Sequence, residues 1–199
     1  MDRATVDLFV EDRAHEEFLR ALLVRLAEEE RRRITLRVRS ARGGHGRVVA
    51  EFEFYQKGIQ KGLFLVPQLL VAAVDANCSS PQEVQRNLES RLAPQLQGRT
   101  AFGCPDPHVE RWFMADPESF AGIVGAEPPR ERRKCERDRY KKQLVETIRK
   151  GGHVPTLGGI EFARDLVFGM DLYRACKNEP SMKAFVDAVR GILRLIPEA

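Results

Sequence analysis

The order of apolar and polar positions predicts alternating strands and helices in the first half of the chain. Four apolar runs are predicted as strands: residues 5–10, 34–38, 69–74 and 99–104. The third run is continuously apolar, which is typical of a strand covered on both faces. Between the strands, apolar residues recur at spacings of three and four, most clearly over residues 14–31, which predicts amphipathic helices. This alternation predicts an α/β, Rossmann-like parallel sheet flanked by helices.

Beyond the fourth strand the pattern predicts helices only. The predicted helices are residues 108–115, 117–123, 132–150, 160–175 and 181–195. Pro128 and Pro129 mark a change in character, from a short apolar helix to a strongly charged segment. We therefore expect an α/β domain at residues 1–126 and a helical C-terminal extension at residues 127–199 packed on it.

Composition narrows the class of protein. Of the 199 residues, 43% are hydrophobic and 31% are charged, an ordinary globular balance that excludes disordered and fibrous classes. The net charge is only +4, but 25 of the 33 basic residues are arginine. Because the guanidinium group matches phosphate and carboxylate geometry, this bias favours anionic partners.

The four cysteines are scattered, without a pair spaced as in a zinc ribbon. We expect four reduced thiols, as in a cytoplasmic protein. No secretory leader is evident in the first ten residues, and the apolar stretch at residues 63–74 is too short to span a bilayer. These features predict a cytoplasmic protein without a membrane partner.

Polar residues that suit metal chemistry follow the predicted strands. Glu11 comes directly after the first strand, Asp75 and Asn77 come after the third, and Glu110 opens a later helix. Ligands of parallel sheets bind at the carboxyl ends of strands, and carboxylate oxygens suit Mg²⁺ or Mn²⁺. The alternative for each residue alone is a solvated carboxylate that caps the following helix.

The same residues carry a resemblance to a known family. Glu11, the stretch Asp75-Ala76-Asn77 and the stretch from Val109 to Pro117 together resemble a Toprim-like domain. More narrowly, residues 5–125 are similar to the uncharacterised bacterial family called domain of unknown function 4276. The resemblance implies a divalent-metal-dependent nuclease, or nuclease subunit, with an ATPase partner in anti-phage defence. It implies metal ligands at Glu11, Asp75, Asn77, Glu110 and Asp116, of which Glu11, Asp75 and Glu110 are catalytic.

Three positions depart from the family pattern. Asn77 replaces a carboxylate, Asp12 stands where glycine is usual, and His15 stands where a second glutamate is often seen. Asn77 keeps a carbonyl oxygen for a metal but removes one negative charge, so we expect Mn²⁺ to be tolerated better than Mg²⁺. The alternative function is a catalytically degenerate binding or regulatory subunit of an ATPase complex.

A basic segment supplies most of the residues that we expect to bind nucleic acid. DNA is favoured over RNA as the partner. Residues 31–47 contain seven arginines and no acid, with a Gly-rich turn at residues 43–46. Close to a metal site, such a segment would bind a phosphate backbone; alternatively it is a solvated strand edge. The candidate residues for nucleic-acid binding are Arg37, Arg39, Arg42, Arg47, Arg111 and Lys141. Trp112, the single tryptophan, is expected in the core.

Overall fold

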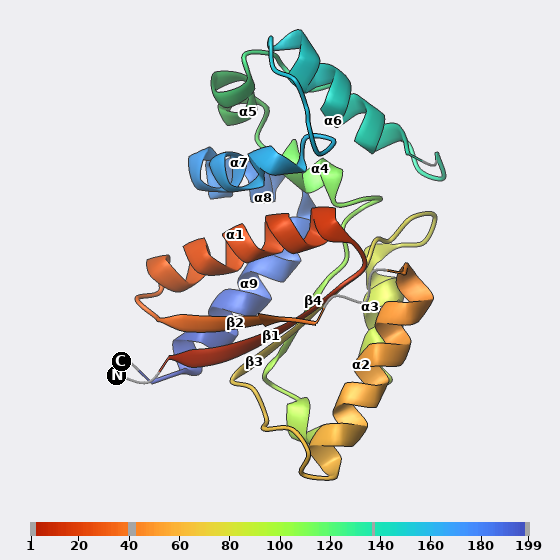
Figure 1. The fold of residues 1–199 in the computed structure, drawn as a ribbon, viewed down its shortest axis with the longest axis vertical. Helices are drawn as coiled ribbons and strands as arrows, with labels where there is room; N and C mark the ends of the chain where they lie inside the picture. The colour runs from red at the N-terminus through yellow and green to blue at the C-terminus, as the bar shows by residue number, and fades with distance from the viewer. Residues whose placement is uncertain (1–2, 40–42, 137, 198–199) are drawn as a thin grey trace.

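The computed structural model describes residues 3–39, 43–136 and 138–197, and it confirms the α/β, Rossmann-like fold (Figure 1). Four parallel strands form one sheet in the order β2-β1-β3-β4. Their bounds are β1 Ala4–Val10, β2 Ile34–Val38, β3 Leu69–Ala73 and β4 Thr100–Gly103. Each observed strand matches a predicted strand to within one residue at each end, and β3, the continuously apolar run, is buried along its whole length.

Helices cover both faces of the sheet. Successive strand residues point to opposite faces, so Leu8 and Val10 pack against one set of helices while Phe9 packs against another. On the first face lie α1 (Arg13–Glu29) and α9 (Pro180–Leu195). On the second face lie α2 (His45–Gln60) and α3 (Pro81–Glu89), visible on the right of Figure 1.

The C-terminal helices complete the first face. They are preceded by α4 (Glu110–Phe113) and α5 (Pro117–Val124), and comprise α6 (Arg139–Lys150), α7 (Ala163–Gly169), α8 (Leu172–Asn178) and α9. Trp112 is fully buried, as predicted, with its ring near Phe18 of α1 and stacked on Phe185 of α9. One hydrophobic core thus includes residues from both sides of the expected boundary at residue 126.

Two predicted helices differ from those observed. The helix expected from residue 132 begins at Arg139, and before it the side chains of Arg132 and Lys134 donate to the carbonyls of Asn178 and Ser79. The helix expected over residues 160–175 is divided between α7 and α8. Asp171 marks the start of a new helix, because its carboxylate accepts hydrogen bonds from the Tyr173 and Arg174 backbone N–H groups and caps α8.

None of the helices in the described part of the chain is both long enough and apolar enough to cross a membrane.

Candidate metal centre

The strand order places Glu11 and Asp75 at the topological switch point of the sheet, where the connections from β1 and from β3 run in opposite directions. From β1 the chain crosses over α1 to β2 on one side, whereas from β3 it crosses over α3 to β4 on the other. Ligands of open α/β sheets bind outside the carboxyl ends of the two strands that flank such a point. Glu11 directly follows β1, and Asp75 lies two residues after β3.

Three side chains come together there. Glu11, His15 and Asp75 each offer one ligand atom, and these atoms all lie within 4.8 Å of one another. The Asp75 backbone N–H donates to Glu11 Oε2 at 3.1 Å, which fixes the two strand ends relative to each other. The first turn of α1 brings in His15, whose Nε2 lies 3.0 Å from Asp75 Oδ1.

His15 is held in one orientation by the residue that caps its helix. Asp12 Oδ1 accepts hydrogen bonds from the His15 backbone N–H at 3.0 Å and from His15 Nδ1 at 2.9 Å. The opposite nitrogen, Nε2, is fully buried and faces the Asp75 carboxylate, with Oδ1 at 3.0 Å. A carboxylate that binds one ring nitrogen and directs the other outward is the usual support for a metal-ligating histidine.

The electrostatics of His15 favour a positive charge at this position. Burial disfavours the imidazolium, but the carboxylates of Asp75 and Asp12 favour it more strongly, so the pKa of His15 is raised well above its usual value. A cation bound at Nε2 would occupy the place of the imidazolium proton between the same carboxylates.

Asp75 is the centre of the cluster. Its Oδ1 accepts the Val109 backbone N–H at 2.9 Å, and its Oδ2 lies 2.8 Å from Nδ1 of His108. Burial opposes ionisation of Asp75, but His15 and His108 outweigh it and lower its pKa. The carboxylate therefore stays charged in a nearly buried position, where an unpaired charge would be very costly.

Glu110 provides a second kind of carboxylate. It is 2% exposed, and its Oε2 has no hydrogen-bond partner within the described residues. Burial and the nearby charge of Asp75 raise its pKa to about 7. A carboxyl group with this pKa, close to a charged cluster, is suited to gain and lose a proton at neutral pH.

Lys141 of α6 balances the charge on the open side. Its Nζ lies 3.7 Å from Asp12 Oδ2. Burial opposes its charge, but Glu110 and Asp12 favour it more, so the pKa of Lys141 is raised. The Lys141 side chain is about half exposed, so an anionic substrate can still reach it.

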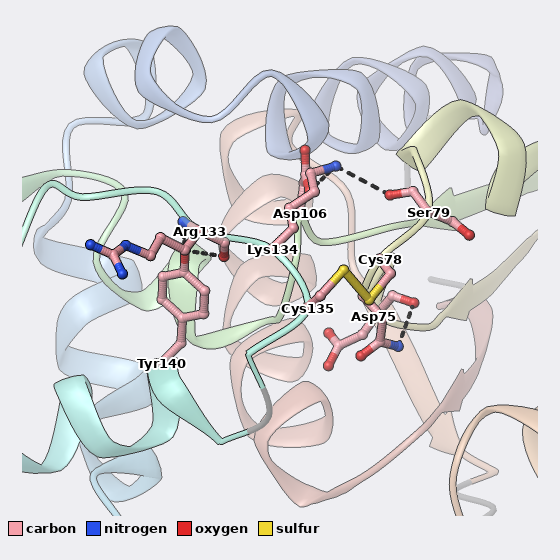
Figure 2. Close-up of a disulfide and its surroundings, with 9 residues drawn as sticks. Asp75, Cys78, Ser79, Asp106, Arg133, Lys134, Cys135 and Tyr140 are labelled. Atoms are coloured by element: carbon pink, nitrogen blue, oxygen red, sulfur yellow. Dashed lines mark hydrogen bonds and ion pairs between the residues drawn. A yellow bond between two sulfur atoms is a disulfide. The ribbon is translucent and has the colours of Figure 1, made fainter.

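A disulfide closes the rim of the site (Figure 2). Cys78, which follows Asp75 in the loop after β3, is bonded to Cys135, which precedes α6. The neighbouring Lys134 contacts Asp106 at 2.8 Å and the Ser79 carbonyl at 3.2 Å. The expectation of four reduced thiols is therefore wrong for this pair; Cys104 and Cys176 are free. The bond joins the loop carrying Asp75 to the segment leading to Lys141.

Of the other predicted metal ligands, Glu110 and Asp116 are outside the group formed by Glu11, His15 and Asp75, whereas Asn77 contacts that group through the Asp75 carbonyl. Asn77 is exposed, has a left-handed backbone with φ of 52°, and donates from Nδ2 to the Asp75 carbonyl at 3.3 Å. Asp116 is buried and pairs with Arg174 at 3.0 Å through both carboxylate oxygens. Burial would raise the pKa of Asp116, but the hydrogen bonds from Arg174 lower it to about 2. The structure thus gives Asp116 a role in joining α5 to α8 rather than a place in the metal cluster.

Most of the predicted nucleic-acid residues have other contacts. Arg37 forms a two-point ion pair with buried Asp7 at 2.6 and 2.9 Å. The Arg39 guanidinium lies over the rings of Tyr55 and Phe64.

Among the remaining candidates, Arg47 pairs with Glu51 at 3.0 Å on the exposed surface of α2. Arg111 is buried and pairs with Glu179, so it is not available to a phosphate backbone at the surface. Arg42 lies outside the described residues. Lys141 alone among these candidates is placed beside the metal cluster.

Three residues of the cluster were not assigned to the site from sequence: Asp12, His15 and His108. Asp12 and His15 carry a usable signal, because an aspartate followed three residues later by histidine at a helix start puts both side chains over the strand end. His108 carries none, because its approach depends on the path of the loop between β4 and α4.

Neither the protein-family models, nor the curated proteins, nor the solved structures with which the chain was compared match it.

Proposed function

We propose that this protein is a divalent-metal-dependent phosphodiesterase that acts on nucleic acid, that is, a nuclease or a nuclease subunit. The observation that carries the proposal is the convergence of Glu11, His15 and Asp75 at the topological switch point of the sheet. The Toprim-like pattern of the sequence supports the same chemistry, because it singles out Glu11 and Asp75.

The donor set fits a divalent cation. Glu11 and Asp75 offer carboxylate oxygens, and His15 offers a buried Nε2 that faces the Asp75 carboxylate. Oxygen donors alone suit Mg²⁺, whereas an imidazole nitrogen favours a transition metal such as Mn²⁺. When bound, such a cation polarises a phosphoryl oxygen and makes water a better nucleophile.

The remaining residues supply protons and charge. Glu110, with a pKa of about 7, is placed to accept a proton from water or to return one to a leaving oxygen. Lys141 supplies positive charge beside the cluster, where the phosphate becomes more negative during reaction. Asp12 and His108 act as positioning residues, because each orients a member of the cluster through a hydrogen bond.

A second candidate function is a non-hydrolytic subunit that binds nucleic acid or an ATPase. Asn77 favours it, because this residue lacks the carboxylate that the resemblance assigns to its position. The ATPase partner, the role in anti-phage defence and the cytoplasmic location remain predictions from resemblance and composition.

A nuclease assay on labelled DNA and RNA, with Mg²⁺, Mn²⁺ or chelator, separates the two functions. We expect Mn²⁺-dependent cleavage by the wild type, loss of cleavage in Glu11→Ala, and stronger Mg²⁺-dependent cleavage in Asn77→Asp. Glu17→Gln is the matched control, because Glu17 is on α1 and forms only an ion pair with Arg13 at 3.7 Å. Absence of cleavage with binding retained would favour the second function, and cleavage unaffected by Glu11→Ala would exclude this site.

A further inference from the structure

A second site-like feature lies apart from the metal cluster, among α4, α5, α8 and the segment that precedes α6. It is a cavity of about 360 Å³, within the size range of small-ligand pockets. Its apolar wall consists of Met114, Ala115, Pro117 and Pro129. The cavity therefore has an apolar side.

Charged side chains dominate the rest of the lining, and positive charge is in excess. The five cations are Arg111, Arg130, Arg132, Arg174 and Lys177, against the three carboxylates Asp116, Glu118 and Glu179. The carboxylates are already paired: Asp116 and Glu118 with Arg174, and Glu179 with Arg111 and Arg132. Arg130 and Lys177 are both exposed and form no ion pair or hydrogen bond with the described part of the chain.

Buried polar atoms in the lining are left without partners. Arg111 has a side chain only 7% exposed, and although its Nη2 binds Glu179, its Nε has no hydrogen-bond partner within the described residues. The same holds for Oε2 of Glu179, whose side chain is 1% exposed. Because these two atoms are inaccessible to solvent, they lie behind the cavity surface, and the cations available to a ligand are the exposed Arg130 and Lys177.

We propose that this cavity binds a nucleotide through its phosphate group. A phosphate dianion matches the excess positive charge and accepts from the Arg130 guanidinium and from the Lys177 ammonium. The half-buried Pro117 and Pro129 in the lining provide the apolar surface that receives the base or sugar. The ligand is either a free nucleotide or the phosphorylated terminal nucleotide of a strand.

Replacement of Arg130 and Lys177 tests the proposal without disturbing the fold, because neither side chain forms an ion pair or hydrogen bond with the described residues. Calorimetry in chelator at low salt would measure binding of adenosine monophosphate, adenosine, inorganic phosphate, and an oligonucleotide with or without a 5′-phosphate. We expect at least tenfold weaker binding of the phosphorylated probe in Arg130→Ala with Lys177→Ala than in wild type. Lys150→Ala, an exposed cation at the end of α6, should not change it.

The arms of the experiment also identify the source of the ligand. Binding of the free nucleotide assigns the cavity to a soluble nucleotide, and binding of the 5′-phosphorylated strand alone assigns it to a strand end. Binding of no probe at millimolar concentration, or equal affinity in the double variant, would overturn the proposal. Because chelator removes divalent ions, neither result depends on the metal centre.

Discussion

Asp12 and His15 form the contact that prepares the metal centre: Asp12 Oδ1 lies 2.9 Å from His15 Nδ1, and the opposite ring nitrogen lies 3.0 Å from Asp75. The same Asp12 oxygen accepts the His15 backbone N–H and so caps α1. One carboxylate thus begins the helix and orients the ring that the helix carries. Helix geometry and site geometry are coupled at this residue.

Replacing Asp12 with asparagine separates these two roles. Asparagine keeps a cap acceptor, so helix stability should change by only a few tenths of a kcal/mol. Loss of the charge weakens the support of His15, and we expect roughly 10–100-fold lower Mn²⁺ affinity. Electron paramagnetic resonance of free Mn²⁺ during titration would measure it, with Glu17→Gln as the control. Equal affinity in Asp12→Asn and wild type would show that Asp12 serves only as a cap.

Glu110 should lower stability as the pH rises. Its folded-state pKa of about 7 lies above the ordinary value of 4.5, so its protonated form is favoured by folding. The contribution of Glu110 to the free energy of unfolding is fully present below about pH 4.5. It decreases as the pH rises and is constant above about pH 7. Glu110→Gln should therefore raise the free energy of unfolding by about 3 kcal/mol at pH 8 and change it little at pH 4.

Denaturant unfolding in chelator at the two pH values would measure this difference. Glu146→Gln, an exposed residue of α6, is the control and should show no pH-dependent change. A Glu110→Gln protein that is destabilised at pH 8 would contradict the account.

Asp116 should stabilise the fold at neutral pH and lose this effect in acid, the reverse of the pH dependence of Glu110. Its pKa is lowered from 3.8 to about 2 by the pairing with Arg174, so it stabilises the fold above pH 4 and loses this effect as the pH falls towards 2. Asp116→Asn should cost about 2 kcal/mol at pH 7 and much less at pH 2. Asp165→Asn, at an exposed position of α7, serves for comparison. A pH-independent loss would mean that packing, not charge, accounts for the effect.

The disulfide should contribute to stability through the loop that it closes. Cys78 and Cys135 are 57 residues apart, and a loop of this length corresponds to about 4 kcal/mol in the chain-entropy description. Cys78→Ser should lower the free energy of unfolding by up to that amount under oxidising conditions, and the difference should vanish in reductant. Cys176→Ser is the control with a free thiol. A wild type insensitive to reductant would show that the bond is absent in solution.

The sheet, and the meeting of Glu11 with Asp75 at its edge, could be predicted from the sequence. The apolar runs specify the strands, and parallel strands bring their carboxyl ends to one edge, which is why Glu11 and Asp75 meet. The rest depends on contacts between distant segments. Lys141 reaches the cluster from α6, and Asp116 resembles a metal ligand in sequence until Arg174, 58 residues later, is seen beside it.

The arginines illustrate the same limit. A run of basic residues at 31–47 predicts a phosphate-binding surface, but Asp7 on the neighbouring strand β1 pairs with Arg37 and two aromatic rings cover Arg39. The carboxylates that pair with an arginine and the rings that stack on it come from other elements, so sequence alone does not show which arginines are free to bind a phosphate.

The central claim is that Glu11, His15 and Asp75 bind one divalent cation. Anomalous diffraction from crystals grown with Mn²⁺ tests it most directly, because the ion is located without reference to activity. The account predicts a single strong peak within coordination distance of His15 Nε2 and of the Glu11 and Asp75 carboxylates, absent in His15→Gln crystals. A wild-type map with no peak at these three side chains, at a Mn²⁺ concentration that saturates the protein in solution, would contradict it.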